Sequence, residues 1–416
     1  MKILWITNFL FPEAISQITD CGEFNTTGGW VLGLADVMTE QKDIELSVAT
    51  VSHLVKSLTI INGKNITYYI IPLGKGNIKY NKEYESYWKK INLYMQPDVV
   101  HIHGTEYSHG LAFVNACGGE KVIVSIQGLK SGIAPYYCAG LSRKIILRNI
   151  TFRDLIKGGI YRERRRFYKT GKLEIEILRK VNHIIGRTSW DMAHVKAINP
   201  GATYHFCNEI LRKEFYDGSC WKYTDCNKHT IFLSQGSSPI KGLHQLIKAM
   251  PLILHYYPDT IIRIAGRNII NNDGLYGFLH FTGYGKIIKK LIKKYHLEDK
   301  LIFLGPLNAN QIKDEYLHSN IFICPSSIEN SPNSLGEAQI LGVPCIASYV
   351  GGIPDMMVSN EDGMYRFEEI EMLANKICNI FASSNHYNND LTMHLAEKRH
   401  NATNNIQQLL SIYKQL

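Results

Sequence analysis

Two glutamates, Glu329 and Glu337, lie in a stretch whose pattern changes from strand to loop to helix. The apolar run 320–324 is typical of a strand, and a helix is expected to begin near Pro332, because proline is well tolerated in a first helical turn. Glu329 is then expected on the loop and Glu337 inside the helix. Carboxylates accept hydrogen bonds from hydroxyl groups, and helix N-termini favour phosphate. A nucleotide sugar carries both kinds of group.

A second candidate phosphate site precedes it in the chain. The loop that contains Gly236, Ser237 and Ser238 leads to Lys241 and Gly242 at an expected helix start. Small residues, backbone N–H groups and one lysine beside a helix N-terminus form a plausible cradle for a diphosphate. A Gly/Ser loop alone is weakly specific. Its weight comes from its expected place at the same sheet edge as the two glutamates.

The first half of the chain supplies further candidates. Gly28 and Gly29 precede a helix, where they either let the backbone approach a ligand closely or form a plain turn and cap. His101 and His103 share one face of an expected strand. His101 is interpreted as structural. His103 lies nearest the carboxyl end, the edge where open α/β sheets bind ligands, so a functional role is predicted for it.

Two polar residues end later strands of the same half. Gln127 can bind a hydroxyl group or cap a turn. Arg187 can meet an anionic group at the sheet edge, or pair with Asp191 or Glu209. The sequence does not separate these alternatives.

These candidates depend on two series of strands that alternate with helical patterns. The expected strands are 2–8, 44–50, 65–72, 98–103, 121–127 and 183–187, then 229–234, 260–265, 301–304, 320–324 and 344–348. Such alternation predicts α/β domains with mostly parallel sheets. The polar stretch 211–228 lacks periodicity and is interpreted as the junction. We therefore predict domains 1–212 and 213–390, with a C-terminal helical stretch, 391–416, that can pack back on the first domain.

Length and composition agree with this division. At 416 residues the chain exceeds what one hydrophobic core normally carries. It has no apolar run of about 18 residues, so no spanning helix is expected. It begins directly with a strand pattern rather than a signal peptide, and its nine cysteines form no CxxC pair. The odd number of cysteines and the expected lack of a secretion signal favour reduced thiols and a cytoplasmic location.

The charge is concentrated in one block. The whole chain carries +9, and residues 141–172 hold eleven Lys and Arg against Asp154 and Glu163, also a net +9. The block also contains apolar residues: Ile145, Ile146, Leu147, Ile150, Phe152, Leu155 and Ile156. A basic amphipathic segment predicts contact with an anionic membrane surface. A solvated helical face and a groove for an anionic substrate are the alternatives. No nucleic-acid-binding signature accompanies the block, so no nucleic acid partner is predicted.

The motifs together resemble a known family. The Glu329 and Glu337 spacing, followed by Leu341-Gly342-Val343-Pro344 and Gly351-Gly352, resembles the E-x7-E region of retaining glycosyltransferases of family 4. The likeness covers nearly the whole chain. It is closest in the second half, and it is looser in the first. It implies the GT-B fold, in which two Rossmann-like doubly wound domains face a central cleft.

The resemblance also implies roles for the residues. Glu337 would bind the ribose hydroxyls of the donor. Glu329, with backbone N–H groups around Asn333, would hold hydroxyls of the transferred sugar. Lys241 would neutralise the diphosphate, and His103 would contact the donor sugar at the reaction centre.

The remaining donor contacts would come from glycines, small residues and the base-binding position: Gly28, Gly29, Gly236, Ser237, Ser238, Leu307, Ser334 and Leu335. Gln127 and Arg187 would lie on the acceptor side. No metal or other cofactor is implied. One departure is clear, because the family usually has arginine five residues before the lysine and this chain has Gly236. Ser237, Ser238 or Arg267 are candidates to compensate.

The implied activity is transfer of a sugar from a UDP- or GDP-sugar to a hydroxyl acceptor. A lipid-linked saccharide in surface polysaccharide assembly is the expected acceptor, with the protein peripheral at the inner face of the plasma membrane. The alternatives are a nucleotide-sugar 2-epimerase and a non-catalytic nucleotide-sugar-binding protein of the same fold.

Overall fold

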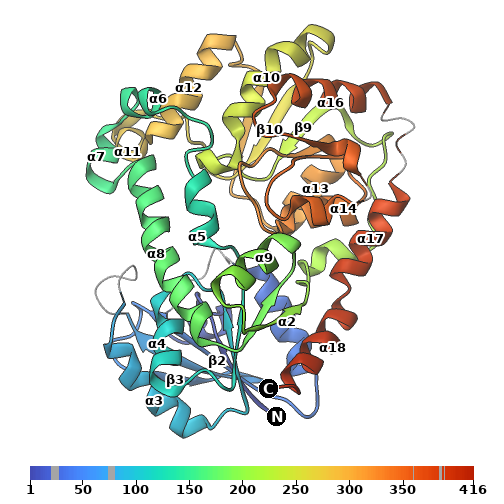
Figure 1. Ribbon diagram of the computed structural model, residues 1–416. Coiled ribbons are helices and arrows are strands. Elements are labelled where there is room, and N and C mark those ends of the chain that lie inside the picture. Colours follow the sequence, from blue (N-terminus) through green and yellow to red (C-terminus); the bar gives the residue numbers. More distant parts are fainter. Residues whose placement is uncertain (20–27, 74–79, 359, 384–386, 388) are drawn as a thin grey trace. The chain divides into compact units, whose positions relative to one another are not determined.

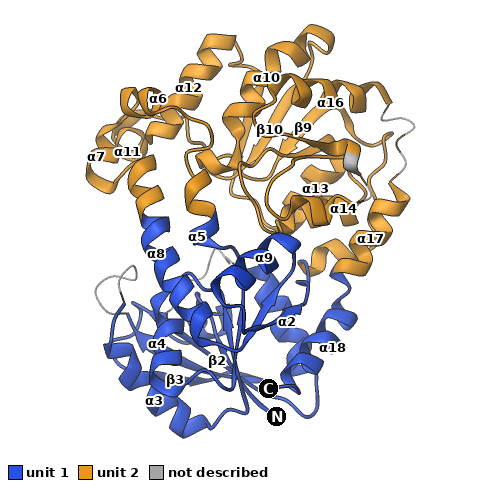
Figure 2. Ribbon diagram, viewed as in Figure 1, with its two compact units in different colours: residues 1–132, 166–211, 400–416 blue, residues 133–165, 212–399 orange. Residues whose placement is uncertain are grey.

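The computed structural model describes residues 1–19, 28–73, 80–358, 360–383, 387 and 389–416 (Figure 1). Its chain forms two compact units (Figure 2). The first unit comprises Met1–Gly132, Arg166–Leu211 and His400–Leu416, and the second comprises Ile133–Arg165 and Arg212–Arg399. Each unit is built around its own sheet.

The sheet of the first unit has the order β3-β4-β2-β1-β5-β6-β7-β8, and only the β3–β4 pair is antiparallel. The strands are β1 (Lys2–Ile6), β2 (Glu45–Ser52), β3 (Thr59–Asn62), β4 (Ile66–Pro72), β5 (Val99–His103), β6 (Val122–Ser125), β7 (His183–Gly186) and β8 (Thr203–Phe206). All six predicted strands are present, while the short outer strands β3 and β8 were not predicted. Strand order reverses between β1 and β5, so the binding edge of this sheet is where His103 ends β5.

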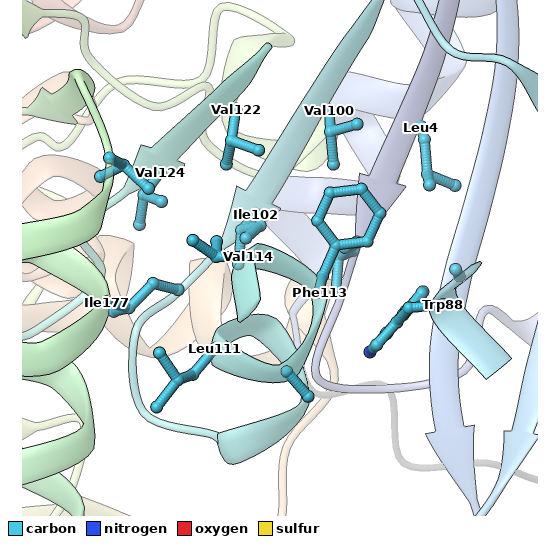
Figure 3. Close-up of a cluster of buried hydrophobic side chains, with 14 of the residues drawn as sticks. Leu4, Trp88, Val100, Ile102, Leu111, Phe113, Val114, Val122, Val124 and Ile177 are labelled. Atoms are coloured by element: carbon cyan, nitrogen blue, oxygen red, sulfur yellow. The ribbon is translucent and has the colours of Figure 1, made fainter. Parts of the chain in front are cut away.

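Helices pack on both faces of this sheet. They are α1 (Pro12–Ser16), α2 (Gly29–Thr39), α3 (Glu83–Met95), α4 (Ser108–Cys117), α9 (Ser189–Ile198) and α18 (Ala402–Tyr413), with α5 (Lys130–Ile133) and α8 (Ile160–Lys180) running across the division between units. On one face, Trp88 of α3 and Phe113 of α4 pack against Leu4 and Val100 (Figure 3). On the other face, α2 and α18 bury residues against β1, among them Met38 and Tyr413.

The second unit has an all-parallel sheet of order β11-β10-β9-β12-β13-β14. Its strands are β9 (Asn227–Leu233), β10 (Ile261–Ala265), β11 (Leu301–Gly305), β12 (Ser319–Cys324), β13 (Cys345–Ser348) and β14 (Met364–Tyr365). The five predicted strands are present, and the two-residue β14 is additional. Strand order reverses between β9 and β12. The lysine loop follows β9 and the Glu329 loop follows β12, so both lie at this reversal.

The helices of the second unit are α6 (Arg143–Arg148), α7 (Phe152–Lys157), α10 (Leu243–Tyr256), α11 (Gly274–His280), α12 (Gly283–Tyr295), α13 (Ala309–His318), α14 (Asn333–Ile340), α15 (Ile353–Met356), α16 (Ile370–Ser383) and α17 (Asp390–His400). A short 3-10 turn, η3 (Pro239–Lys241), precedes α10. The C-terminal stretch is two helices rather than one, because the Asn401 side chain accepts a hydrogen bond from Asn404 N at 2.9 Å and caps α18.

The division differs from a single cut at residue 212 in two respects, of which one is that residues 400–416 belong to the first unit. Residues 133–165 belong to the second unit, although they precede the junction in sequence. His244 Nε2 lies 2.9 Å from the carbonyl oxygen of Ala139, and Thr151 Oγ1 donates to the carbonyl of Phe281 at 2.7 Å. These long-range contacts attach residues 133–165 to helices and loops of the second unit. Among the described residues, no helix combines the length and apolar character needed to cross a bilayer.

The cluster in Figure 3 makes a stability prediction. Phe113 is 2% exposed, so Phe113→Ala should destabilise the protein by about 3–5 kcal/mol through lost transfer energy and a cavity. Leu93→Ala on α3 is the control, because Leu93 is 75% exposed and its loss should cost about 0.5 kcal/mol or less. Urea unfolding followed by circular dichroism measures both. Equal midpoints for the two variants would contradict the packing described.

Candidate functional site

An ion pair lies at the reversal point of the second sheet. Lys241 Nζ donates to Glu329 Oε1 at 2.6 Å, and Ser326 Oγ donates to the same oxygen at 2.7 Å. Burial by itself would lower the pKa of Lys241, but attraction and hydrogen bonding by Glu329 outweigh it and raise that pKa. The ammonium group is therefore held in its charged form. The structure brings these two predicted site residues together.

The two loops that carry the pair are joined through their backbones. Gly242 has a φ of +71°, and a Cβ there would lie 1.6 Å from the carbonyl oxygen of Pro325. Beside it, Ser327 N donates to the carbonyl of Ile240 at 2.8 Å. Glycine is thus required at 242 for both the left-handed backbone and the close approach.

A second pair of glycines supports Glu329 from the other side. Gly352 N donates to the carbonyl oxygen of Glu329 at 3.0 Å. Gly351 has a φ of +52°, and a Cβ there would lie 1.9 Å from the same oxygen. The backbone at Glu329 is therefore fixed by the turn that follows β13.

Glu337 is 4% exposed and is bound by an arginine that the sequence did not single out. Arg212 Nε and one terminal nitrogen each donate to a different oxygen of Glu337, both at 2.8 Å. The guanidinium also lies over the ring of Phe215, 5.0 Å from its centroid. Burial raises the pKa of the Glu337 carboxyl, and the charge of Arg212 opposes that shift. Arg212 lies in the aperiodic junction, where the sequence pattern gave no sign of it.

The helix that carries Glu337 begins one residue later than the position of Pro332 suggested. Pro332 is its N-cap, with extended φ and ψ, and Asn333 is the first helical residue. Ser334 follows in the first turn, where its carbonyl accepts from Tyr316 Oη at 2.8 Å, and Leu335 is buried.

The loop after β9 is tightly packed at the position where the family pattern has arginine. Gly236 is buried, and a Cβ there would lie 3.0 Å from side-chain atoms of both Ile264 and Leu243. Ser237 is exposed, and Ser238 is the residue before the η3 turn. Compensation by these serines stays a prediction.

Two other donor candidates lie at loop positions in the second unit. Leu307 is partly exposed and follows β11 directly before α13. Arg267 donates to the carbonyl oxygen of His280 at 3.4 Å. Within the part of the chain that the structure describes, neither side chain forms a hydrogen bond or ion pair with Lys241 or Glu329.

In the first unit, His103 is 3% exposed and surrounded by rings. Ring centroids lie 3.8 Å away for His101, 4.7 Å for Trp5 and 5.7 Å for Trp30. Within the described residues, neither ring nitrogen of His103 has a hydrogen-bond partner. Burial lowers the pKa of His103 to about 3, so the ring is neutral at physiological pH. A buried polar group without a partner is costly, which makes His103 a candidate for ligand contact.

His101 has a structural explanation. One ring nitrogen lies 2.5 Å from Tyr413 Oη of α18, and the other lies 2.6 Å from Ser125 Oγ. Trp5 Nε1 donates to the same Tyr413 hydroxyl at 3.1 Å. These contacts tie the C-terminal helix to the strands that carry the histidines.

A cavity of about 30 Å³ adjoins His103 and Arg187. Arg187 is buried; its guanidinium pairs with Glu209 and donates to the carbonyls of Ile126 and Gln127 at 2.9 and 3.1 Å. Its backbone N–H donates to Asp191 instead. These contacts use the terminal nitrogens of Arg187, whereas Arg187 Nε and the Gln127 amide nitrogen are buried with no partner in the part of the chain described.

The glycines before α2 lie within the described residues. Gly28 caps the helix with a φ of +88°, a Cβ there would lie 2.3 Å from the Phe9 ring, and Gly29 is the first helical residue. The loop that leads to them, 20–27, lies outside the described residues.

The part of the chain that carries these contacts is similar to a known protein family. Residues 225–408 match the family model described as glycosyl transferases group 1. This part of the chain is therefore similar to group 1 glycosyltransferases. The matched residues include the Lys241–Glu329 pair and Glu337, whereas Arg212 lies before them in the sequence.

A curated relative matches over a limited length. The chain is 27% identical over 206 residues to the phosphatidylinositol N-acetylglucosaminyltransferase gpi3 subunit of Schizosaccharomyces pombe. The match covers 49% of this chain and 42% of that protein. The matches to this and two other curated relatives each span less than half of the relative's length.

Solved structures match over the whole chain. Sucrose-phosphate synthase from Thermosynechococcus elongatus superposes with a TM-score of 0.66 at 16% identity, covering 100% of this chain and 98% of that one. HepE from Anabaena in complex with UDP-glucose gives 0.67 at 12% identity, covering 100% of both chains. These likenesses confirm the GT-B fold, with its two parallel-sheet domains.

The Arg212–Glu337 pair makes a prediction with a pH signature. Arg212→Met leaves the Glu337 carboxylate buried without its partner, which should cost about 3–5 kcal/mol of stability at neutral pH. Without Arg212 the pKa of Glu337 rises further, because burial is then less opposed. Protonation at acidic pH removes the unpaired charge, so the cost should shrink as the pH falls. Thermal unfolding of the variant across the acidic range measures this trend.

A double variant controls that experiment. Arg212→Met with Glu337→Gln removes both charges and should recover part of the lost stability at neutral pH. Glu214 and Tyr316 also face this pair and remain unchanged in both variants. A cost that is independent of pH and is not relieved by Glu337→Gln would show that Arg212 acts by packing alone.

Proposed function

We propose that this chain is a retaining glycosyltransferase of family 4 that moves a sugar from a UDP- or GDP-sugar to a hydroxyl acceptor. The observation that carries the proposal is the contact of Lys241 with Glu329 at 2.6 Å, within the residues that match group 1 glycosyltransferases. The UDP-glucose complex of the HepE neighbour and the sugar transfer named for the gpi3 subunit support a nucleotide-sugar donor.

The nucleotide-sugar donor would bind to the charged side chains of the two ion pairs described above. Lys241 has three N–H donors, and one of them is used on Glu329, so others remain for a diphosphate. The Glu329 carboxylate has capacity beyond Lys241 and Ser326 for hydroxyls of the sugar. Glu337 is proposed to accept from the ribose hydroxyls while Arg212 keeps it charged. The N-terminus of α14, with Asn333, Ser334 and Leu335, would add backbone donors.

Transfer would proceed at the anomeric carbon. The bond from that carbon to the diphosphate oxygen breaks, and the acceptor oxygen forms its bond on the same face. The acceptor proton passes to the departing diphosphate, so no nucleophile from the protein is required. Lys241 would stabilise the charge that develops on the leaving group. His103, neutral and without a partner among the described residues, would contact the donor sugar.

The proposed acceptor is a lipid-linked saccharide used in surface polysaccharide assembly. The phosphatidylinositol acceptor named for the gpi3 subunit supports a lipid-borne acceptor. The basic block supports contact with an anionic membrane, at the cytoplasmic face. Gln127, with its buried amide nitrogen, is the candidate acceptor contact in the first unit.

The donor assignment is tested on two variants. Glu329→Gln and Lys241→Met should each lower turnover about tenfold or more, because each removes a charge from the donor site while keeping side-chain size. A thermal-shift panel of UDP- and GDP-sugars first selects the donor, since a bound ligand raises the melting temperature. Release of nucleoside diphosphate with a lipid-linked acceptor then measures turnover.

The matched control is Glu315→Gln. Glu315 forms a bidentate ion pair with Arg263 at 2.7 Å in the same unit, so this variant also removes one carboxylate charge from an ion pair. It should leave turnover unchanged. Full activity of Glu329→Gln would reject the donor site. Epimerisation of UDP-N-acetylglucosamine without acceptor, or binding with no turnover, would instead favour the 2-epimerase or the binding protein.

The proposal includes catalysis without a metal ion. Lys241 and the backbone donors of the helix N-termini would supply the charge stabilisation that a divalent cation supplies elsewhere. Exhaustive treatment with EDTA should therefore leave turnover within about twofold of the untreated enzyme. Loss of activity that Mg²⁺ or Mn²⁺ restores would overturn this part of the proposal and leave the donor site intact.

A further inference from the structure

Nine large apolar side chains are exposed on three neighbouring helical segments of the second unit. They are Ile145, Leu147, Ile150, Phe152, Leu155, Ile156, Leu275, Phe278 and Leu279, and we call them the apolar patch. Two of them, Leu155 and Leu275, are 71% and 76% exposed. Soluble proteins rarely expose so many large apolar side chains in one place without a binding partner.

The patch comes from two stretches that are far apart in sequence, residues 145–156 on and between α6 and α7 and residues 275–279 on α11. The rings of Phe152 on α7 and Phe278 on α11 are stacked, with centroids 5.6 Å apart. Figure 1 shows α6, α7, α11 and α12 together at one end of this unit. The apolar surface therefore extends beyond the basic block to α11, which the sequence pattern did not indicate.

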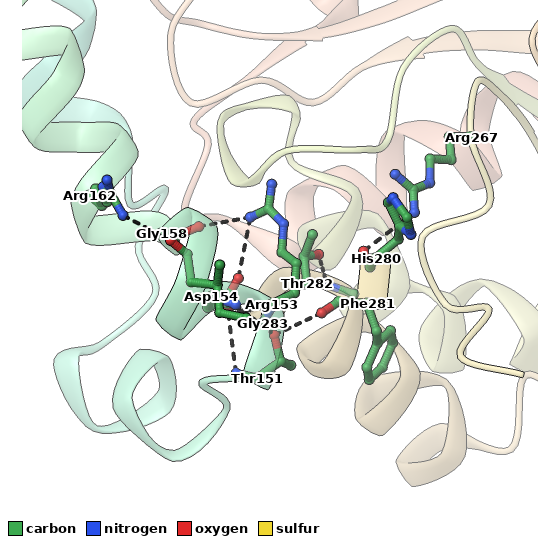
Figure 4. A network of polar contacts seen from close by, with 12 residues as sticks. Thr151, Arg153, Asp154, Gly158, Arg162, Arg267, His280, Phe281, Thr282 and Gly283 are labelled. Carbon is green, nitrogen blue, oxygen red and sulfur yellow. Dashed lines mark hydrogen bonds and ion pairs between the residues drawn. The ribbon is translucent and has the colours of Figure 1, made fainter. Parts of the chain in front are cut away.

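A polar network fixes the two segments to each other (Figure 4). Asp154 accepts from Gly283 N at 2.7 Å, and Thr151 Oγ1 donates to the carbonyl of Phe281 at 2.7 Å. A Cβ at Gly283 would lie 2.4 Å from Asp154, so glycine permits this approach. Arg153 donates to the carbonyl of Gly158 at 2.7 Å and closes the end of α7. The patch is thus a preorganised surface rather than two loose helices.

Positive charge surrounds the patch. Residues 143–165 and 273–295 contain thirteen Lys and Arg and three Asp and Glu, so their net charge is thirteen minus three, or +10. One of the three acids, Asp154, is buried in the network just described. Five of the lysines lie on α12, which carries no acidic residue. Exposed apolar side chains within a basic surface are complementary to an anionic bilayer, whose headgroups attract the charges and whose interior accepts the side chains.

We propose that α6, α7 and α11 together form a membrane-insertion surface that binds the face of an anionic bilayer, with the lysines of α12 beside it. The apolar patch enters the interfacial region, and the basic residues around it contact the lipid phosphates. This surface is a property of the second unit, and it does not depend on the proposed sugar transfer.

The test measures binding of the full chain to vesicles without donor or acceptor, so it is independent of glycosyltransfer. Vesicles of phosphatidylcholine with about one third phosphatidylglycerol should bind the protein, and pure phosphatidylcholine should bind it more weakly. Raising NaCl from about 0.1 M to about 0.5 M should reduce binding, because it screens the charges. Co-sedimentation gives the partition coefficient. No binding to anionic vesicles would overturn the proposal.

Two single variants test whether both segments take part. Leu155→Ser on α7 and Leu275→Ser on α11 should each lower the partition coefficient about tenfold or more, because each removes an inserted side chain. Leu93→Ser on α3 of the first unit is the matched control, since Leu93 is equally exposed at 75% and should not change binding. Circular dichroism checks that all three variants fold.

Three other results would each overturn or reassign part of the proposed membrane surface. An effect of Leu155→Ser without one of Leu275→Ser would overturn the two-segment surface. A dimer in solution that both variants dissociate, with vesicle binding unchanged, would assign the patch to a second copy of the chain. Replacement of Arg143, Lys144 and Arg148 by Gln should weaken binding to anionic vesicles alone; equal weakening on neutral vesicles would contradict the electrostatic part.

Discussion

The candidate site depends on the backbone contact between the loop after β9 and the loop after β12. Gly242 lies against the carbonyl of Pro325 so closely that no side chain fits between them, and Ser327 N bonds to the carbonyl of Ile240. This contact sets the position of Lys241 relative to Glu329. A partly buried ion pair is favourable only when its geometry is well defined, because both charges lose hydration. Gly242 therefore contributes to the Lys241–Glu329 attraction, because it permits the backbone contact that holds the two charges close together.

Both glutamates of the motif are paired with cations in the described structure. Glu329 contacts Lys241, and Glu337 contacts Arg212. Each pairing places a cation against a carboxylate, and a charged carboxylate is the stronger acceptor for hydroxyl groups. The same pairing limits the cations, because part of their hydrogen-bonding capacity is already used. Binding of a polyhydroxyl phosphate would therefore redistribute hydrogen bonds within existing pairs rather than fill an empty charged site.

The sequence predicted the regular parts of this arrangement well. Eleven expected strands are present because parallel strands covered on both faces have dense runs of Ile and Val. It missed β14, which has two residues, and the outer strands β3 and β8, whose patterns are too short to separate from loops. It also missed Arg212, since a side chain in an aperiodic junction is brought to Glu337 only by tertiary folding. The attachment of residues 133–165 to the second unit has the same origin: Thr151 and Asp154 find partners near residue 282, and local spacing carries no signal of such contacts.

The packing around Gly236 bears on why this position has glycine where the family pattern has arginine. A side chain at this position would begin 3.0 Å from side-chain atoms of Ile264 and Leu243, so a larger residue requires these neighbours to shift. The two ion pairs that remain sum to zero charge, whereas a further arginine would leave an excess of one positive charge for a diphosphate. For the proposed donor, we expect phosphate binding to rely more on backbone N–H groups, on Ser237 and Ser238, and on the dipole at the start of α14. The position of the backbone N–H groups is set by the loop conformation. We therefore expect these groups to stabilise the phosphate charge that a flexible arginine stabilises in the family pattern.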